Sequence, residues 1–313
     1  MSTGLFQDPV FAAHDTGPGH PESPARHAAV TRALHEAGLT ERLPALPSRP
    51  ADWAELERCH PRRYLELVRR ETAAGHGTLS TGDTQFGPRS LAAALQAVGG
   101  VLGAVDAVMT GVHRRAFCAV RPPGHHARAE QGMGFCFFNN VALGARHAQR
   151  RHGADKIAIV DWDVHHGNGT QDLFYDDGSV LFFSTHQSPW YPFTGDAAET
   201  GEGRGRGTTL NCPLVAGAGI KEVGAAFEER LLPALEAFKP DLILISAGFD
   251  SRENDPLGRF RLTDADFVWL TRLLKQAADS LCQGRLVSVL EGGYRLDGLS
   301  RAVTAHVGEL AVE

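Results

Sequence analysis

Short apolar segments alternate with longer segments of mixed polarity along most of the chain. Five of the apolar segments predict buried strands. They are AFCAV (116–120), KIAIV (156–160), VLFFS (180–184), DLILISA (241–247) and RLVSVL (285–290). The longer segments predict helices near 24–37, 88–110, 139–152, 220–238 and 263–282. The first of these helices has Pro24 directly after Ser23, an arrangement typical of a helix start.

This alternation predicts an α/β fold. Strands that alternate with helices form a mainly parallel sheet covered by helices on both faces, which gives three layers, α/β/α. We find no internal repeat and no low-complexity linker, and the glycine-rich segment 200–209 predicts a tight loop. We therefore expect one domain that spans residues 1–313.

Composition narrows the function classes. The chain has 313 residues, of which 42% are hydrophobic and 22% charged, as in an ordinary globular enzyme. The net charge of −6 argues against a broad nucleic-acid-binding face. The five cysteines are scattered without a C-x-x-C pair, which argues against a disulfide framework and predicts a reducing, cytoplasmic location. We expect no signal peptide and no membrane span. A homo-oligomer stays possible.

Ionisable and polar residues follow each of the five predicted strands. These groups are Arg121 to His126, then Asp161, Asp163, His165 and His166, then Thr185 and His186, then Gly248 to Asp250, and finally Glu291 to Tyr294. In an open parallel sheet the binding crevice lies beyond the carboxyl ends of the strands. The sequence therefore predicts that five distant segments form one shared site.

The segment after the second strand predicts a metal site. If the chain stays extended, Asp161, Asp163 and His165 project to the same side, because residues two apart in a strand share a face. Carboxylate and imidazole together suit zinc or a similar divalent ion. Helix capping would explain one polar residue here, such as Asn168, but not two aspartates and two histidines. A catalytic zinc site has three protein ligands, and Asp250 is the best third candidate.

His125 and His126 have two interpretations, either as metal ligands or as acid–base groups beside the metal. In the second interpretation each needs an orienting partner, for which Asp161 and Asn168 are candidates. An ionised aspartate holds its histidine more positive than a neutral asparagine does, so the two imidazoles would titrate differently. Tyr294 could donate a hydrogen bond to a developing oxyanion, or simply pack over the end of the sheet.

Taken together, these motifs resemble the histone deacetylase family, the zinc-dependent branch of the arginase–deacetylase fold. The similar segments are HPESPAR (20–26), DT (83–84), RPPGHH (121–126), GFCFFNNVA (134–142), DWDVHHGNGTQ (161–171), STH (184–186), SAGFDSRENDPLG (246–258) and EGGY (291–294). These segments occur in the same order as in the family and span nearly the whole chain. The asparagine at position 168 resembles the class II branch of the family.

The resemblance implies a role for each matching position. Asp163, His165 and Asp250 match the zinc ligands; His125, His126 and Tyr294 match the catalytic residues, with Asp161 and Asn168 as partners. Gly134, Phe135, Tyr191, Asp83, Leu257 and His20 match substrate-binding positions, and Arg26 matches an arginine below the metal. A structural K⁺ is implied near Asp161, Asp163, His165, Ser184 and Thr185. Whether zinc or ferrous iron is native, and which histidine moves the proton, stay open.

We therefore predict a zinc-dependent hydrolase that removes acetyl or related short acyl groups from lysine in proteins or peptides. Acetylpolyamines are the alternative substrate. Leu257 stands where polyamine-selective relatives carry glutamate, which favours a neutral substrate unless Glu22 or Asp83 supplies negative charge at the rim. A binuclear manganese ureohydrolase fits less well because D-x-H-x-D is absent, and H-E-x-x-H of zincin proteases is absent too. An acyl-ligand binding protein is the non-enzyme alternative.

Overall fold

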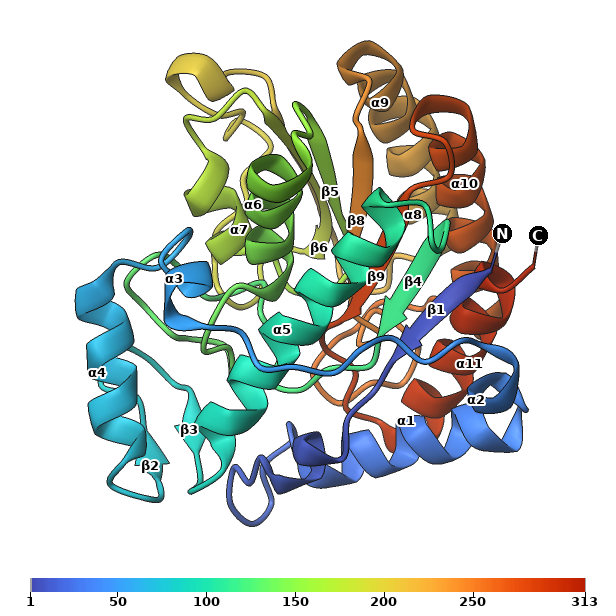
Figure 1. Cartoon of the computed structure of the whole chain (residues 1–313). Helices are drawn as coiled ribbons and strands as arrows, with labels where there is room; N and C mark the ends of the chain where they lie inside the picture. Colours follow the sequence, from blue (N-terminus) through green and yellow to red (C-terminus); the bar gives the residue numbers. More distant parts are fainter. Residues whose placement is uncertain (1, 313) are drawn as a thin grey trace.

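A seven-stranded sheet forms the centre of the molecule, and all its neighbouring strands run parallel (Figure 1). The computed structural model describes residues 2–312. In spatial order the strands are β1 (Thr3–Phe6), β4 (Arg115–Cys118), β9 (Leu286–Leu290), β8 (Leu242–Ala247), β5 (Ile157–Asp161), β6 (Val180–Gln187) and β7 (Thr209–Leu214). This confirms the predicted α/β fold class.

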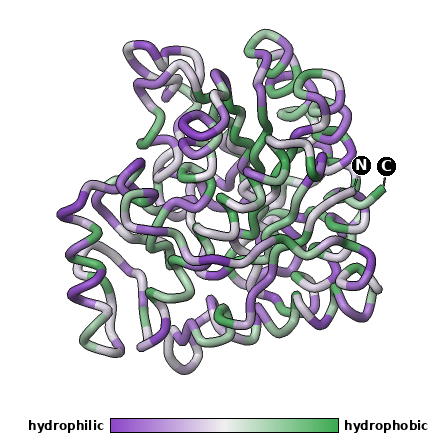
Figure 2. The backbone as a smooth tube through the Cα atoms, in the orientation of Figure 1, coloured by the Kyte–Doolittle hydropathy of each residue, from purple (hydrophilic) through white to green (hydrophobic). Residues whose placement is uncertain are grey.

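Alternation along the strands divides the core into two layers. In β5, Ile157 and Ile159 belong to one hydrophobic cluster, whereas Ala158 and Val160 belong to the other. This is the period-two pattern of a strand that is buried on both faces. Figure 2 shows the hydrophobic stretches gathered in the central strands and more hydrophilic stretches on the outer helices and loops.

Helices cover both faces of the sheet (Figure 1). One face carries α3 (Trp53–Leu56), α4 (Arg62–Thr72), α5 (Ser90–Met109), α6 (Asn140–His152) and α7 (Asn168–Phe174). The other carries α1 (Pro24–Glu36), α2 (Leu39–Arg42), α8 (Ile220–Ala226), α9 (Leu232–Phe238), α10 (Asp264–Leu281) and α11 (Leu296–Leu310). The other elements are η1 (Pro9–Ala13), η2 (Gly203–Gly205), the π-helical turn η3 (Phe227–Leu231) between α8 and α9, and a small hairpin of β2 (Gly77–Thr78) and β3 (Gln85–Phe86).

Helix α5 is the one helix within residues 2–312 that is long and apolar enough to cross a bilayer. Its most apolar window is 67% buried inside the protein. Its composition is therefore accounted for by its place in the core, against α6 and the sheet.

The structure differs from the sequence prediction in several elements. The helix predicted over 220–238 contains a π-helical turn, η3 (Phe227–Leu231), just before Pro233. Proline has no N–H and cannot complete the regular helical ladder, which accounts for a wider turn there. Strands β1 and β7 and helices α4 and α11 were not predicted. The five cysteines are free and buried.

Candidate active site

The carboxyl ends of four adjacent strands deliver the candidate site residues to one place. His125 and His126 follow β4, Glu291 to Tyr294 follow β9, Asp250 follows β8, and Asp161 ends β5. All these strands are parallel neighbours in the sheet, so their ends meet on the same edge. The predicted convergence is confirmed for four of the five segments. Thr185 and His186 lie within β6 instead of after it, and neither lines the cavity described below.

Asp163, His165 and Asp250 form a buried group whose ligand-type atoms all lie within 4.8 Å of one another. Nδ1 of His165 lies 2.9 Å from Oδ1 of Asp163 and 3.2 Å from Oδ2 of Asp250. The chain does not stay extended as expected, because β5 ends at Asp161 and residues 163–165 bend. The bend still turns Asp163 and His165 toward Asp250, whereas Asp161 is directed to His125 instead.

The chemistry of this group fits a divalent cation. Oδ2 of Asp250 is buried and has no hydrogen-bond donor. Burial, together with the adjacent Asp163 carboxylate, raises the pKa of Asp250 to about 7. Burial alone lowers the pKa of His165, but its hydrogen bond to Asp163 and the adjacent negative charge of Asp250 raise that pKa to about 10. Two buried carboxylates thus attract positive charge, which a metal ion between them would supply.

The two adjacent histidines have different partners and different protonation. Nδ1 of His125 lies 2.8 Å from Oδ2 of Asp161, and Nδ1 of His126 lies 2.7 Å from Oδ1 of Asn168. Burial alone would lower the pKa of His125, but Asp161 and Asp163 raise it well above its ordinary value. Burial and the positive charge of His125 lower the pKa of His126 well below its ordinary value. The expected difference in titration is therefore present.

Asn168 does not cap helix α7, because it is the first helical residue and its side-chain oxygen bonds to His126. Asp161 pairs with Ser184 in the register of β5 and β6, and Ser184 and Thr185 are both buried. Asp161 and Ser184 are therefore neighbours across β5 and β6, with Thr185 next to Ser184 in the chain.

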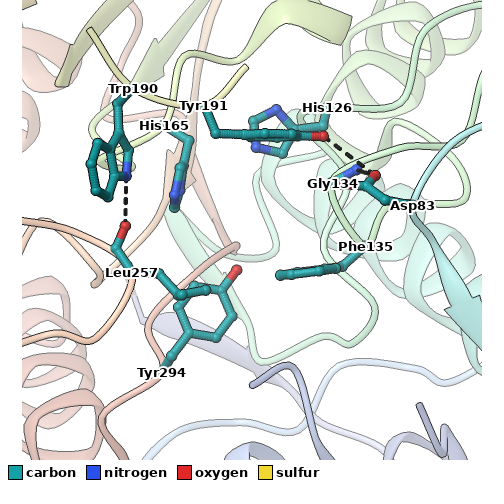
Figure 3. A pocket seen from close by; sticks show the side chains of 9 residues that line it. All are labelled: Asp83, His126, Gly134, Phe135, His165, Trp190, Tyr191, Leu257 and Tyr294. Carbon is teal, nitrogen blue, oxygen red and sulfur yellow. Dashed lines mark hydrogen bonds between the residues drawn. The ribbon is translucent and has the colours of Figure 1, made fainter. Parts of the chain in front are cut away.

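A cavity of about 230 Å³ opens above the ligand group. Its walls are formed by Asp83, His126, Gly134, Phe135, His165, Trp190, Tyr191, Leu257 and Tyr294 (Figure 3). The lining is mostly apolar, with His126 and His165 on one side and the phenol oxygen of Tyr294 directed into the space (Figure 3). A mostly apolar cavity with a few convergent polar groups is the usual form of a small-ligand site.

A buried arginine packs against the ring of Tyr294, one of the cavity walls. The Arg26 guanidinium lies 5.0 Å from the centre of the Tyr294 ring and donates hydrogen bonds to the carbonyl oxygens of Gly293 and Glu291, both at 2.6 Å. Burial and the negative charge of Asp250 raise the pKa of Tyr294 well above its ordinary value. The phenol therefore keeps its proton at neutral pH and can donate a hydrogen bond.

Gly134 can only be glycine in this backbone. Its φ is +55°, and a Cβ would lie 2.2 Å from Cδ2 of His126. Its N–H donates to Oδ1 of Asp83 at 2.7 Å, and the Tyr191 hydroxyl donates to the same oxygen at 3.3 Å (Figure 3). Asp83 thus links two walls of the cavity at its exposed side.

The structure changes what was expected of two residues, Glu22 at the rim of the cavity and His20 as a substrate-binding residue. Glu22 is fully buried and paired with Arg26 and Arg121, so it supplies no charge at the rim. This expectation was wrong, because the Glu22 side chain is enclosed in the protein by its two arginine partners and does not reach solvent. His20 is not among the residues that line the cavity; its ring contacts the edge of Phe135, with centroids 4.6 Å apart.

Two residues of the site were missed in the sequence. Trp190 lines the cavity and donates from Nε1 to the carbonyl oxygen of Leu257 at 2.7 Å (Figure 3). Asp255 is buried and accepts hydrogen bonds from the N–H groups of Leu257, at 2.9 Å, and Tyr294, at 2.7 Å. Asp255 joins the wall residue to the candidate catalytic tyrosine. An aspartate before proline in DPLG gives no signal of such distant partners.

A second group of ligand-type side chains lies away from the cavity, between α5 and α6. Nε2 of His147 and Nε2 of His152 are each 2.7 Å from Oδ1 of Asp106. Arg58 donates to Nδ1 of His147 at 2.7 Å. Because Nδ1 accepts, Nε2 of neutral His147 carries the proton that it donates to Asp106. This group is satisfied by its own hydrogen bonds.

Comparisons with known proteins agree with this arrangement. Residues 20–310 match the histone deacetylase domain family. The chain is 43% identical over 293 residues to the histone deacetylase-like amidohydrolase of Pseudomonas aeruginosa, covering 93% of this chain and 75% of that protein. It is 42% identical over 300 residues to human polyamine deacetylase HDAC10, covering 92% of this chain and 44% of that protein. The crystal structure of the HDA15 HD domain superposes with a TM-score of 0.94 at 37% identity, covering 99% of this chain and 88% of that one.

The fold and the site therefore define a hydrolase of the arginase–deacetylase type. The chain belongs to the histone deacetylase family.

Proposed function

We propose that the protein is a zinc-dependent deacetylase that hydrolyses the amide bond of acylated lysine in proteins or peptides. The observation that carries this proposal is the meeting of three groups at the cavity: His126, the phenol of Tyr294 and the Asp163–His165–Asp250 ligand group. Hydrolysis of an amide needs a base for water, a donor for the oxyanion and an electrophile, and these groups supply all three.

We assign the metal-binding role to Asp163, His165 and Asp250. One Zn²⁺ bound there supplies Lewis acidity toward an acyl carbonyl oxygen and a water molecule. We also propose a structural K⁺ near the carboxyl end of β5, where Asp161 lies opposite Ser184 of β6.

His126 is the proposed proton carrier. It donates its Nδ1–H to Asn168, so the lone pair of Nε2 is available to accept a proton from water. The same nitrogen then delivers the proton to the leaving amine. His125, which Asp161 holds protonated, supplies positive charge next to the developing oxyanion, and Tyr294 donates a hydrogen bond to it.

The walls of the cavity favour lysine in a peptide over a polycation. Among the lining residues, Asp83 is the single acid, and Leu257 presents an apolar side chain. HDAC10 is named a polyamine deacetylase, so acetylated polyamines are the competing substrate class.

The test is a substrate panel on zinc-loaded enzyme, comparing acetyl-lysine peptides with acetylated polyamines. We expect a higher kcat/KM for the peptides, loss of turnover after chelation and recovery with Zn²⁺. Turnover that persists in the fully chelated enzyme would contradict the zinc-dependent mechanism, and a preference for polyamines would overturn the lysine assignment.

A further inference from the structure

Phe193 combines two features that are unfavourable for folding. Its side chain is 80% exposed, the most exposed of the large hydrophobic side chains in residues 2–312. Its φ is +64°, in the left-handed region that bulky residues rarely adopt. Glycine or asparagine adopts a positive φ more easily and would expose no large apolar side chain. The stability of the fold therefore does not account for phenylalanine at this position. Such outliers point to function.

A second aromatic residue with positive φ lies in the wall of the cavity. Phe135 has a φ of +67° and forms one wall of the cavity. The cavity thus already contains one aromatic side chain that is placed by an unusual backbone conformation.

The loop that carries Phe193 is fixed from beneath. Oγ1 of Thr194 lies 2.8 Å from Nδ1 of His166, and the carbonyl oxygen of Gly195 accepts from Nε2 of His186 at 2.9 Å. Gly195 has a φ of +89°, and a Cβ there would lie 2.5 Å from that same His186 nitrogen. The backbone on the C-terminal side of Phe193 is therefore held in place by two buried histidines.

The N-terminal side of the loop is fixed by the cavity wall itself. The N–H of Phe193 donates to the carbonyl oxygen of Trp190 at 2.7 Å. The indole N–H of Trp190 donates a hydrogen bond to the carbonyl oxygen of Leu257, and the guanidinium of Arg259 lies 5.3 Å from the centre of the Trp190 ring. Because Trp190 and Tyr191 line the cavity while Phe193 is exposed, Phe193 lies on the solvent side of this wall.

We propose that Phe193 is a specificity-determining residue that contacts an apolar side chain adjacent to the acylated lysine of a peptide or protein substrate. The inference rests on the proposed function and narrows its substrate class. An aromatic ring on a fixed loop gives apolar contact area at little cost in conformational entropy. A polyamine has no side chain to place there, so this contact would favour peptides.

The experiment uses zinc-loaded enzyme and two matched acetyl-lysine peptides, with leucine or serine on both sides of the lysine. N-acetyl-lysine blocked at both ends by small groups serves as the substrate without flanking side chains. In the unaltered enzyme we expect the leucine peptide to have a kcat/KM about 5- to 20-fold higher, mainly through KM, the effect of partly burying one apolar side chain.

Phe193→Gly suits the left-handed backbone and removes the ring. We expect it to reduce the leucine preference to less than about twofold, with unchanged turnover of the blocked lysine. Phe193→Leu is the matched control, because it keeps an apolar side chain and should keep most of the preference. A leucine preference that persists in Phe193→Gly would overturn the proposal.

Two further outcomes are decisive. If Phe193→Gly also loses turnover of the blocked lysine, Phe193→Asn repeats the test with a residue that tolerates positive φ and keeps a Cβ. Loss of that turnover in both variants would show a structural role and overturn the proposal. If the unaltered enzyme hydrolyses acetyl-lysine but does not discriminate between the peptides, this inference alone fails. If it hydrolyses no acetyl-lysine compound, the proposed function fails.

Discussion

Nδ1 of His126 lies 2.7 Å from the side-chain amide oxygen of Asn168. An amide oxygen can only accept, so His126 carries a proton on Nδ1. Burial and the charge of His125 lower the pKa of His126, so the ring is a neutral imidazole at neutral pH. His125, only one residue earlier, has an aspartate in the equivalent position. The different partners, together with the charges around each ring, shift the pKa values of the two adjacent imidazoles in opposite directions.

Replacing Asn168 by aspartate should raise the pKa of His126, so that less of it is deprotonated at neutral pH. A carboxylate at Nδ1 stabilises the imidazolium and raises the pKa of His126, which in the native protein lies well below its ordinary value. Because a base acts only when deprotonated, the acidic limb of the kcat–pH profile should shift to higher pH, and kcat at neutral pH should fall. The profile between pH 5 and 9 is the measurement. An unchanged acidic limb would show that His126 is not the base.

Tyr294→Phe should remove the oxyanion donor and leave the ligand group intact. Loss of one such donor typically lowers kcat by about 100- to 1000-fold. Zinc content should stay at one ion per chain, because the substitution leaves the buried Asp163–His165–Asp250 group unchanged. Turnover and metal content are measured on the same preparation. Near-normal turnover would exclude the proposed role of the phenol.

The sheet and the convergence of the site could be predicted because they depend on local patterns. Five short apolar segments predicted five of the seven strands, and parallel strands bring their carboxyl ends together. The missed strands, β1 and β7, lie at the two edges of the sheet. Edge strands have one neighbour, and their sequences, TGLF and TLNCPL, contain glycine or proline and mixed polarity that obscure the pattern.

Side chains that act through distant contacts could not be predicted. Asp255 holds the backbone of Tyr294, 39 residues further along the chain, and Trp190 donates to Leu257, 67 residues away. Glu22 was expected at the rim but is buried between two arginines, because the sequence gives its charge but not its burial. Such relationships depend on how loops pack together, which periodicity does not encode.

Asp250→Asn should separate the effects of charge and metal on stability. In the metal-free protein the pKa of Asp250 is raised from 3.8 to about 7, so its ionisation opposes folding. The free energy of unfolding of that form should therefore fall as pH rises through this range. The asparagine variant should lack this fall, and Zn²⁺ should no longer raise its Tm. Thermal unfolding at pH 5 and pH 8, with chelator or with Zn²⁺, checks both. An undiminished Tm increase with Zn²⁺ would remove Asp250 from the ligand group.

Leu257→Glu should change substrate choice without disturbing the metal. Leu257 is a half-buried wall residue, and Asp83 is the single acid among the cavity-lining residues. A second carboxylate would attract the ammonium groups of an acetylated polyamine, and one such charged contact is worth about tenfold in kcat/KM. The ratio of kcat/KM for acetylated polyamine to that for acetyl-lysine peptide should rise by about this factor. Leu257→Gln, similar in size but neutral, should leave the ratio near its original value. An equal change in both variants would show that the size of the side chain, and not its charge, controls which substrate enters.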